Sequence, residues 1–309
     1  MATPSVYPRS LLYCSPSSDA SPVVSPAECY EIIAESLAAR KVTLDTAGSV
    51  GTRSHKKERT RDGVIAVGGN VSLYPTPVDM RTWWPRILGA AETGAGSSGS
   101  PYVYAVAETL PEFYCVKDLT TKVLSYDGLK VNRATLAAGM GQMLSLEMEW
   151  HGKSETNNAA GTVSSAPSPD TTTQPWMFFD GAFTIEGTAR AVKQFSLTIS
   201  NELDLGNYNN SQTRQHLTEL DRIVSCSLTV PFSTDEADIY AADYDGAAAT
   251  LVFTSPVNAN HIMTITLAAL QIERESPTAN GRGEIVLPLS GIARSSGSTK
   301  EIAVQLRTS

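Results

Sequence analysis

FSLTIS (Phe195–Ser200) and VSCSLTV (Val224–Val230) are the two stretches that decide the fold. In both, apolar residues alternate strictly with Ser or Thr, which is typical of strands that are buried on one face and solvated on the other. The same period of two occurs at LSLEMEW (Leu144–Trp150) and at MTITL (Met263–Leu267). Several such strands separated by polar turns indicate a mainly β protein, built as an antiparallel sandwich or barrel.

One segment near the N-terminus has a clear helical pattern. SPAE (Ser25–Glu28) supplies an N-cap, a Pro at the first helical position and a Glu three residues after the cap. Apolar residues follow at helical spacing as far as Leu37. We therefore predict an N-terminal arm, residues 1–41, that contains one helix. Shorter helical turns are expected at Asp79–Leu88 and Asp235–Tyr244.

The composition excludes several classes of protein. The 309 residues include 32 acidic and 24 basic side chains, which gives a net charge of −8 and argues against a general nucleic-acid coat. The four cysteines form no CxxC pair, so neither a zinc site nor a disulfide scaffold is indicated. No stretch has the length of a membrane span or of a signal-peptide core. We therefore expect a soluble protein that is made in a reducing cytosol and has no membrane partner.

The two halves of the chain resemble each other. Val67–Leu73 and Val224–Val230 are each followed by a Pro-containing bend and an acidic helical turn, and the turns end at Gly89 and Gly246. The strands and the glycines are both 157 residues apart, without a gap. The alternative is chance similarity between two β-rich halves, but we favour duplication of one β-domain. The expected organisation is two tandem β-sandwich or barrel domains at 42–153 and 176–294, each with a short helix, joined by a Ser/Thr/Pro linker at 154–175 and followed by a C-terminal strand or tail at 295–309.

Patterns for catalysis and for metal binding are weak. The four histidines lie in different segments, with no second His at i+3 or i+4, and the chain contains no phosphate loop, dinucleotide fingerprint or G-x-S-x-G elbow. Glu147 and Glu149 share a strand face and could imitate a glycosidase carboxylate pair, but a solvated acidic face is the favoured interpretation. We expect no enzymatic activity, no cofactor and no metal.

RSHKKERTR (Arg53–Arg61) is the one basic run of the chain. It can be interpreted as a solvated loop, as a contact with an acidic surface of a neighbouring subunit, or as a nucleic-acid contact. Aromatic residues that would stack on bases are missing from it. The candidate self-assembly residues are Arg53, Lys56, Lys57, Arg59 and Arg61.

VKQFSLTISNEL (Val192–Leu203), followed by RIVSCSLTV (Arg222–Val230), resembles the second half of the tail tube proteins of long-tailed bacteriophages. DGLKVN (Asp127–Asn132) is similar to the first half of those proteins, in which a G-x-K-V-N strand precedes another strand that ends in W/F-x-G, here Trp150–Gly152. The resemblance spans residues 42–294 and rests on a pattern of strands and turns. The N-terminal arm and the long linker depart from that pattern.

The resemblance implies a structural virion protein of the phage tail, synthesised in the cytoplasm of the host bacterium. Family members form stacked rings that enclose a hollow tube, so this chain is expected to be a major tail tube subunit whose acidic lumen lets double-stranded DNA pass without specific binding. Two tube domains per chain predict trimeric rings with pseudo-sixfold symmetry, with hexameric rings as the runner-up. Other expected partners are the tape measure and terminator proteins.

Three alternatives to this function are open at the level of the sequence. One is another tail component, such as a terminator or adaptor. The second is a carbohydrate-binding or hydrolytic β-sandwich that recognises a receptor, which should expose aromatic side chains over a groove. The third is a capsid or decoration protein. For a tube subunit, the long loops Gly48–Asp62 and Asn201–Asp221, together with the N-terminal arm, are the expected contacts between rings.

Overall fold

The computed structural model describes residues 11–308 apart from 47, 49–50, 53, 234–244, 275 and 278–283. The protein is mainly β, with 52% of its residues in strands and 7% in helices, and its strands pair antiparallel, which confirms the predicted fold class. The expected helical turn at Asp235–Tyr244 and the candidate residue Arg53 lie outside the described residues.

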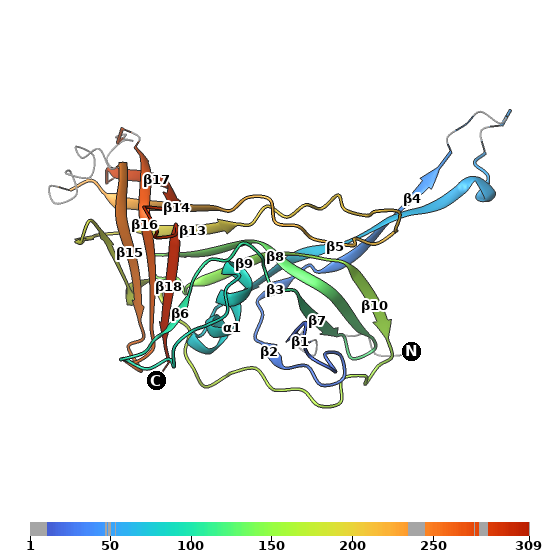
Figure 1. Cartoon of the computed structure of the whole chain (residues 1–309), viewed down its shortest axis with the longest axis horizontal. Helices are drawn as coiled ribbons and strands as arrows, with labels where there is room; N and C mark the ends of the chain where they lie inside the picture. The colour runs from blue at the N-terminus through green and yellow to red at the C-terminus, as the bar shows by residue number, and fades with distance from the viewer. Residues whose placement is uncertain are drawn as a thin grey trace.

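A central sheet extends across the molecule (Figure 1). Its strands, each paired antiparallel with the next, are β4 (Ala38–Asp45), β5 (Thr60–Leu73), β9 (Ser145–Gly152), β8 (Val123–Gly139), β13 (Gln194–Ser200), β14 (Ile223–Pro231), β17 (Val286–Arg294) and β16 (Ile262–Arg274). Short β3 (Ala34–Glu35) also pairs with β5. At the far end, β16 pairs with β15 (Asp245–Thr254) and β18 (Ile302–Arg307), and these strands carry β11 (Gly181–Ile185), β12 (Thr188–Arg190) and β6 (Tyr102–Tyr104).

A smaller sheet branches from β8. Its strands are β2 (Glu28–Tyr30), β1 (Leu11–Pro16), β7 (Phe113–Asp118), β8 and β10 (Ser154–Asn158). The first part of β8, up to Leu129, pairs with β7 and β10, whereas its later part, from Lys130, pairs with β9 and β13. The 17-residue β8 therefore belongs to both sheets.

The central sheet contains the same strand order twice. The first half of the chain contributes β4-β5-β9-β8, and the second half contributes β13-β14-β17-β16. The two units meet at β8 and β13, which pair over seven positions from Gly139↔Gln194 to Arg133↔Ser200. Both halves of the chain therefore share one continuous sheet.

The predicted helix in the N-terminal arm is wrong. Residues 28–45 form β2, β3 and β4, because pairing with β1 and β5 buries Tyr30 and Leu37 while their backbone groups are satisfied by neighbouring strands. Tertiary contacts override the local capping signal at Ser25–Glu28. The predicted linker is also wrong over its first five residues, since Ser154–Asn158 form β10.

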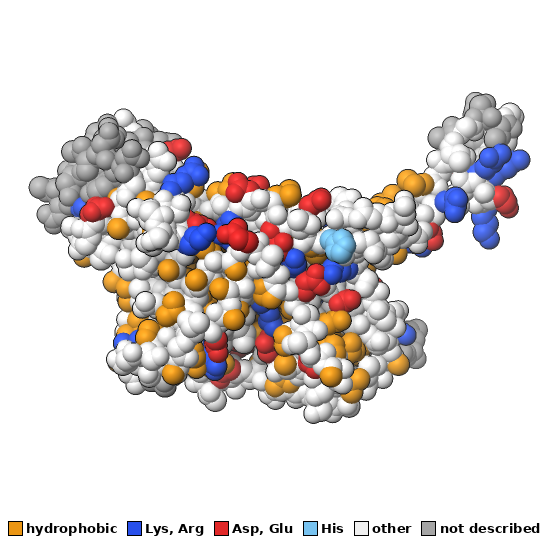
Figure 2. Space-filling view, viewed as in Figure 1, with side chains coloured by type: hydrophobic (Ala, Val, Ile, Leu, Met, Phe, Trp, Pro, Cys, Tyr) orange, Lys and Arg blue, Asp and Glu red, His pale blue; other side chains and the backbone are white. Residues whose placement is uncertain are grey.

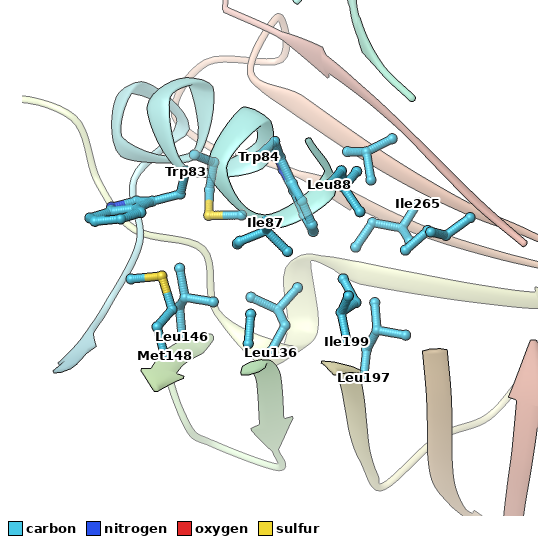
Figure 3. Close-up of a cluster of buried hydrophobic side chains, with 14 of the residues drawn as sticks. Trp83, Trp84, Ile87, Leu88, Leu136, Leu146, Met148, Leu197, Ile199 and Ile265 are labelled. Atoms are coloured by element: carbon cyan, nitrogen blue, oxygen red, sulfur yellow. The ribbon is translucent and has the colours of Figure 1, made fainter. Parts of the chain in front are cut away.

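The expected helical turn at Asp79–Leu88 is confirmed as α1 (Pro77–Leu88), the one α-helix of the described residues. Thr76 and Asp79 form a capping box at its start, and Gly89, at φ 97°, ends it in a conformation that favours glycine. Figure 3 shows its buried side chains facing β8, β9 and β13. Trp83 stacks on Trp150 of β9 at 5.2 Å between ring centroids. The helix thus covers one face of the central sheet and leaves the other face uncovered.

Candidate functional site

The uncovered face of the central sheet is a continuous surface of small polar side chains. A cross-strand row runs from Ser72 through Glu147, Thr135 and Thr198 to Ser225. The name polar face is used here for these residues: Asn70, Ser72, Arg133, Thr135, Glu147, Glu149, Ser196, Thr198, Ser225, Ser227, Glu273 and Ser290. It arises directly from the alternation in the sequence, because each apolar neighbour of these residues points into the core.

The polar face has few charges. Three of these residues are carboxylates, and the one cation among them, Arg133, has its Nη2 3.6 Å from Oε2 of Glu149. Two further exposed arginines, Arg40 of β4 and Arg294 of β17, stand on the same side of the sheet. The second oxygen of Glu149 lies 3.1 Å from Nε2 of His151, and Glu147 accepts a hydrogen bond from the Asn70 amide at 3.2 Å. Burial lowers the pKa of His151 despite the nearby carboxylate of Glu149, which favours the neutral imidazole.

The two halves of the chain are joined on this face by side chains as well as by backbone. The hydroxyls of Thr135 on β8 and Thr198 on β13 lie 3.1 Å apart. A shallow groove of about 240 Å³ follows the second half, lined by hydroxyls such as Ser196, Ser227 and Ser290 and by Glu273. Nothing in this lining resembles an acid–base pair or a nucleophile beside a base.

A long hairpin of β4 and β5 projects from the body (Figure 1). Its far part is exposed and carries Lys and Arg side chains at the end, as Figure 2 shows. The exposed residues Lys56, Lys57, Arg59 and Arg61 are named the basic tip. They form no ion pair within the described part of the chain. Val42 and Leu44, 51% and 58% exposed, add apolar surface to the same hairpin.

The hairpin is braced by the long loop of the second half. The Ile65 N–H donates to the carbonyl of Gln212, and the Gln212 amide donates to the carbonyl of Asp62. Arg214, only 6% exposed, donates to the carbonyls of Val67 and Gly152 at the base of the hairpin. The two predicted long loops therefore meet, although no pattern in the sequence indicated the role of Arg214.

The other sequence candidates lie apart from one another. Glu147 and Glu149 are both held in hydrogen bonds to neighbours on the polar face, as described above. All four cysteines are buried, and burial raises the pKa of Cys29 to about 11 and of Cys226 to about 12. Within the described residues no group of His, Cys, Asp or Glu could hold a metal ion, and no helix is long and apolar enough to cross a membrane.

The aromatic side chains do not form an exposed platform. All four tryptophans are buried, three of them around α1 and β9. Of the described aromatic residues, the large exposed ones are Tyr74 and Phe179. The feature expected of a carbohydrate-binding protein, several aromatic rings over a groove, is thus not seen in the described part of the chain.

Comparison with known families agrees with this geometry. A family model described as phage tail tube protein matches residues 15–293, which is nearly the whole chain. The chain belongs to the phage tail tube family. No curated protein matches it in sequence. This tail tube protein is accordingly a structural component of the virion tail, as the resemblance to that family implied. The matched residues include β2, β3 and β4.

Proposed function

We propose that this tail tube protein is the major tube subunit, and that it assembles with itself into stacked trimeric rings of pseudo-sixfold symmetry around a hollow lumen. The observation that carries the proposal is the repeated strand order of the central sheet. Two four-stranded units, β4-β5-β9-β8 and β13-β14-β17-β16, are already joined side by side in one chain. Three chains would supply six such units to one ring, and head-to-tail contacts close a ring when the rotation between units fits.

The polar face is the surface that we propose lines the lumen. DNA that passes through a tube must not adhere, and adhesion depends on cations that neutralise phosphates. Among the residues that we named the polar face, the guanidinium of Arg133 is opposed by Glu149, and the remaining side chains are hydroxyls, an amide and carboxylates. Such a wall gives double-stranded DNA no site for specific binding.

The projecting hairpin is our candidate for the contact between rings. Its basic tip is exposed and unpaired within the described residues, and its apolar residues Val42 and Leu44 also face solvent. An exposed segment of this kind gains more from burial against a neighbouring subunit than from remaining in water. The tape measure and terminator proteins of the tail would be the further partners, inside the lumen and at the end of the tube.

A hexameric ring of six full chains is the alternative stoichiometry, and a terminator or adaptor is the alternative tail role. Electron microscopy of the purified protein separates them. We expect hollow tubes with a regular axial repeat and, in a three-dimensional reconstruction, three chains per ring. Six chains per ring would refute the trimer, and single closed rings that never stack would refute the role of major tube subunit.

A further inference from the structure

Two of the four cysteines lie opposite each other in the smaller sheet. In the antiparallel pairing of β1 with β7, Cys14 is the direct partner of Cys115. Both are free thiols, both are 0% exposed, and both belong to the same buried cluster. The two thiols are in hydrogen-bonding contact with each other. Their sulfur atoms therefore meet on one face of the sheet.

The hydrogen bonds of this ladder show which kind of pair the two cysteines form. The Ser17 N–H donates to the carbonyl of Glu112, and this pair follows directly on Pro16 in the register. Because hydrogen-bonded and non-hydrogen-bonded pairs alternate along an antiparallel ladder, Pro16 and Cys14 both stand at non-hydrogen-bonded positions. Pro16, which has no N–H to donate, fits this alternation. At such positions the Cα atoms are about 4.5 Å apart, within the range of roughly 4.4–6.8 Å that a disulfide requires.

The other two cysteines stand elsewhere. Cys29 of β2 is opposite Tyr13, so it points to the other face of the smaller sheet from Cys14, and it belongs to a separate buried cluster. Cys226 lies on β14 of the central sheet, between β13 and β17. Among the four cysteines, all of which the structure describes, Cys14 and Cys115 are thus the pair whose positions accept a bridge.

We propose that Cys14 and Cys115 form a disulfide bond after the tail has left the reducing cytosol of the host cell. Disulfides persist on virions and cell surfaces, whereas thiols are kept reduced in the cytosol. A component of the virion tail passes from the second environment into the first. The bond is therefore a modification of the mature tail, and it does not depend on how many chains form a ring.

The oxidant is a small disulfide such as oxidised glutathione. The thiolate of one cysteine attacks a sulfur of that disulfide, which forms a mixed disulfide and releases one glutathione as its thiolate. The thiolate of the second cysteine then attacks the protein sulfur of the mixed disulfide, forms the cross-strand bond and releases the second glutathione. Two protein thiols are oxidised to one disulfide, one glutathione disulfide is reduced, and the two thiol protons pass to the two glutathione thiolates.

Burial makes this reaction depend on a local opening of β1. It raises the pKa of Cys115 well above its ordinary value, so little thiolate is present while the strand is in place. The outer neighbour of β1 is β2, a strand of only three residues. Once formed, the bond ties β1 to β7 and keeps Glu28 of β2 beside Arg86. Oxidation should therefore fasten residues 11–30 to the body of the protein.

Counting thiols tests the bond on the full-length protein. Reduced protein is compared with protein refolded from urea in a mixture of reduced and oxidised glutathione; both are denatured, treated with N-ethylmaleimide and weighed by mass spectrometry. We expect four labelled cysteines before oxidation and two after it, with a Cys14–Cys115 peptide in the digest. Cys14→Ala should give no cross-link, whereas the control Cys226→Ala, which removes a buried cysteine of the central sheet, should still lose two thiols.

Thermal unfolding supplies a second measurement that needs no substitution. Oxidised wild-type protein should have a Tm roughly 3–7 °C above that of the reduced protein, and dithiothreitol should abolish the difference. Four labelled thiols after refolding in the glutathione mixture, or a link between any other two cysteines, would overturn the bond. An unchanged or lower Tm of the cross-linked protein would overturn its stabilising role. Neither measurement requires rings or tubes, so failure here is distinct from failure of the proposed function.

Discussion

Outside the proposed assembly surfaces, Glu28→Gln is the substitution that we expect to lower the free energy of unfolding most. Oε2 of Glu28, on β2, lies 2.7 Å from Nη1 of Arg86, on α1. The Arg86 side chain is 7% exposed, lies over the rings of Trp83 and Phe113 at 5.0 and 4.9 Å, and also donates to the hydroxyl of Tyr30. The substitution keeps the size of the side chain but leaves a buried guanidinium without its counter-charge.

The expected cost follows from this burial. Removal of one partner from a buried ion pair costs about 3–5 kcal/mol of unfolding free energy. The Glu28 side chain is 20% exposed, so water can replace part of the lost contact. We therefore expect a loss of about 2–3 kcal/mol of unfolding free energy. For a chain of this length, that corresponds to a fall in Tm of roughly 3–5 °C.

Urea denaturation of the unassembled subunit, followed by tryptophan fluorescence, measures this cost, because Trp83 lies directly against Arg86. Glu31→Gln, an exposed Glu on the same segment, is the matched control and should change the midpoint little. The double variant Glu28→Gln/Arg86→Met should recover part of the loss, since the buried charge is then absent. A loss below about 1 kcal/mol for Glu28→Gln, or losses that simply add in the double variant, would refute the reasoning.

Three further predictions concern the surfaces. Glu147→Lys combined with Glu149→Lys gives the polar face more cations than carboxylates, so DNA binding should appear in a filter-retention assay. Between 50 and 200 mM salt, the logarithm of the binding constant should fall with the logarithm of the salt concentration with a slope of about −1 to −3. Unchanged binding would contradict the role of the face. Reversal of all four charges of the basic tip should leave Tm within about 1 °C but yield rings that do not stack, and tubes of normal length in electron micrographs would exclude this role. Because burial lowers the pKa of His151 in the folded state, the unfolded state binds more protons as pH falls through about 6.5, and stability is lost there. His151→Gln should flatten the curve of unfolding free energy between pH 7.5 and 5.5, unlike the control His216→Gln, and an unaltered slope would refute the assignment.

The strands could be predicted from the sequence wherever one face is buried and the other is solvated. Phe195–Ser200, Val224–Val230 and Leu144–Trp150 alternate because their apolar residues contact the core beneath α1 while their polar residues form the polar face. The helical turn at Asp79–Leu88 could be predicted as well, although α1 begins two residues earlier, at Pro77. In these elements local pattern and tertiary environment agree.

The N-terminal segment could not be predicted in this way, because its conformation depends on distant partners. Glu28 looked like the third residue of a capping box, but its carboxylate is used by Arg86, and the backbone around it pairs with β1. Arg214 was missed for a related reason: its partners, the carbonyls of Val67 and Gly152, are brought beside it only by the fold. Long-range pairings of this kind leave no periodic trace in a single sequence.

The charge of the polar face refines the argument that linked the net charge of −8 to DNA passage. The residues of that face include three carboxylates and one arginine, and Arg40 and Arg294 stand on the same side of the sheet, so the acidic surplus lies elsewhere on the molecule. Repulsion from a densely acidic wall is therefore not the main effect to expect in the proposed lumen. The middle of the face instead offers DNA few cations, and where cations are few, phosphates release few counterions and gain little affinity. The Ser and Thr residues that make the strands recognisable in the sequence are thus the same residues that would let DNA slide, because an alternating strand with hydroxyls on its solvent face is both easy to fold and weakly adhesive.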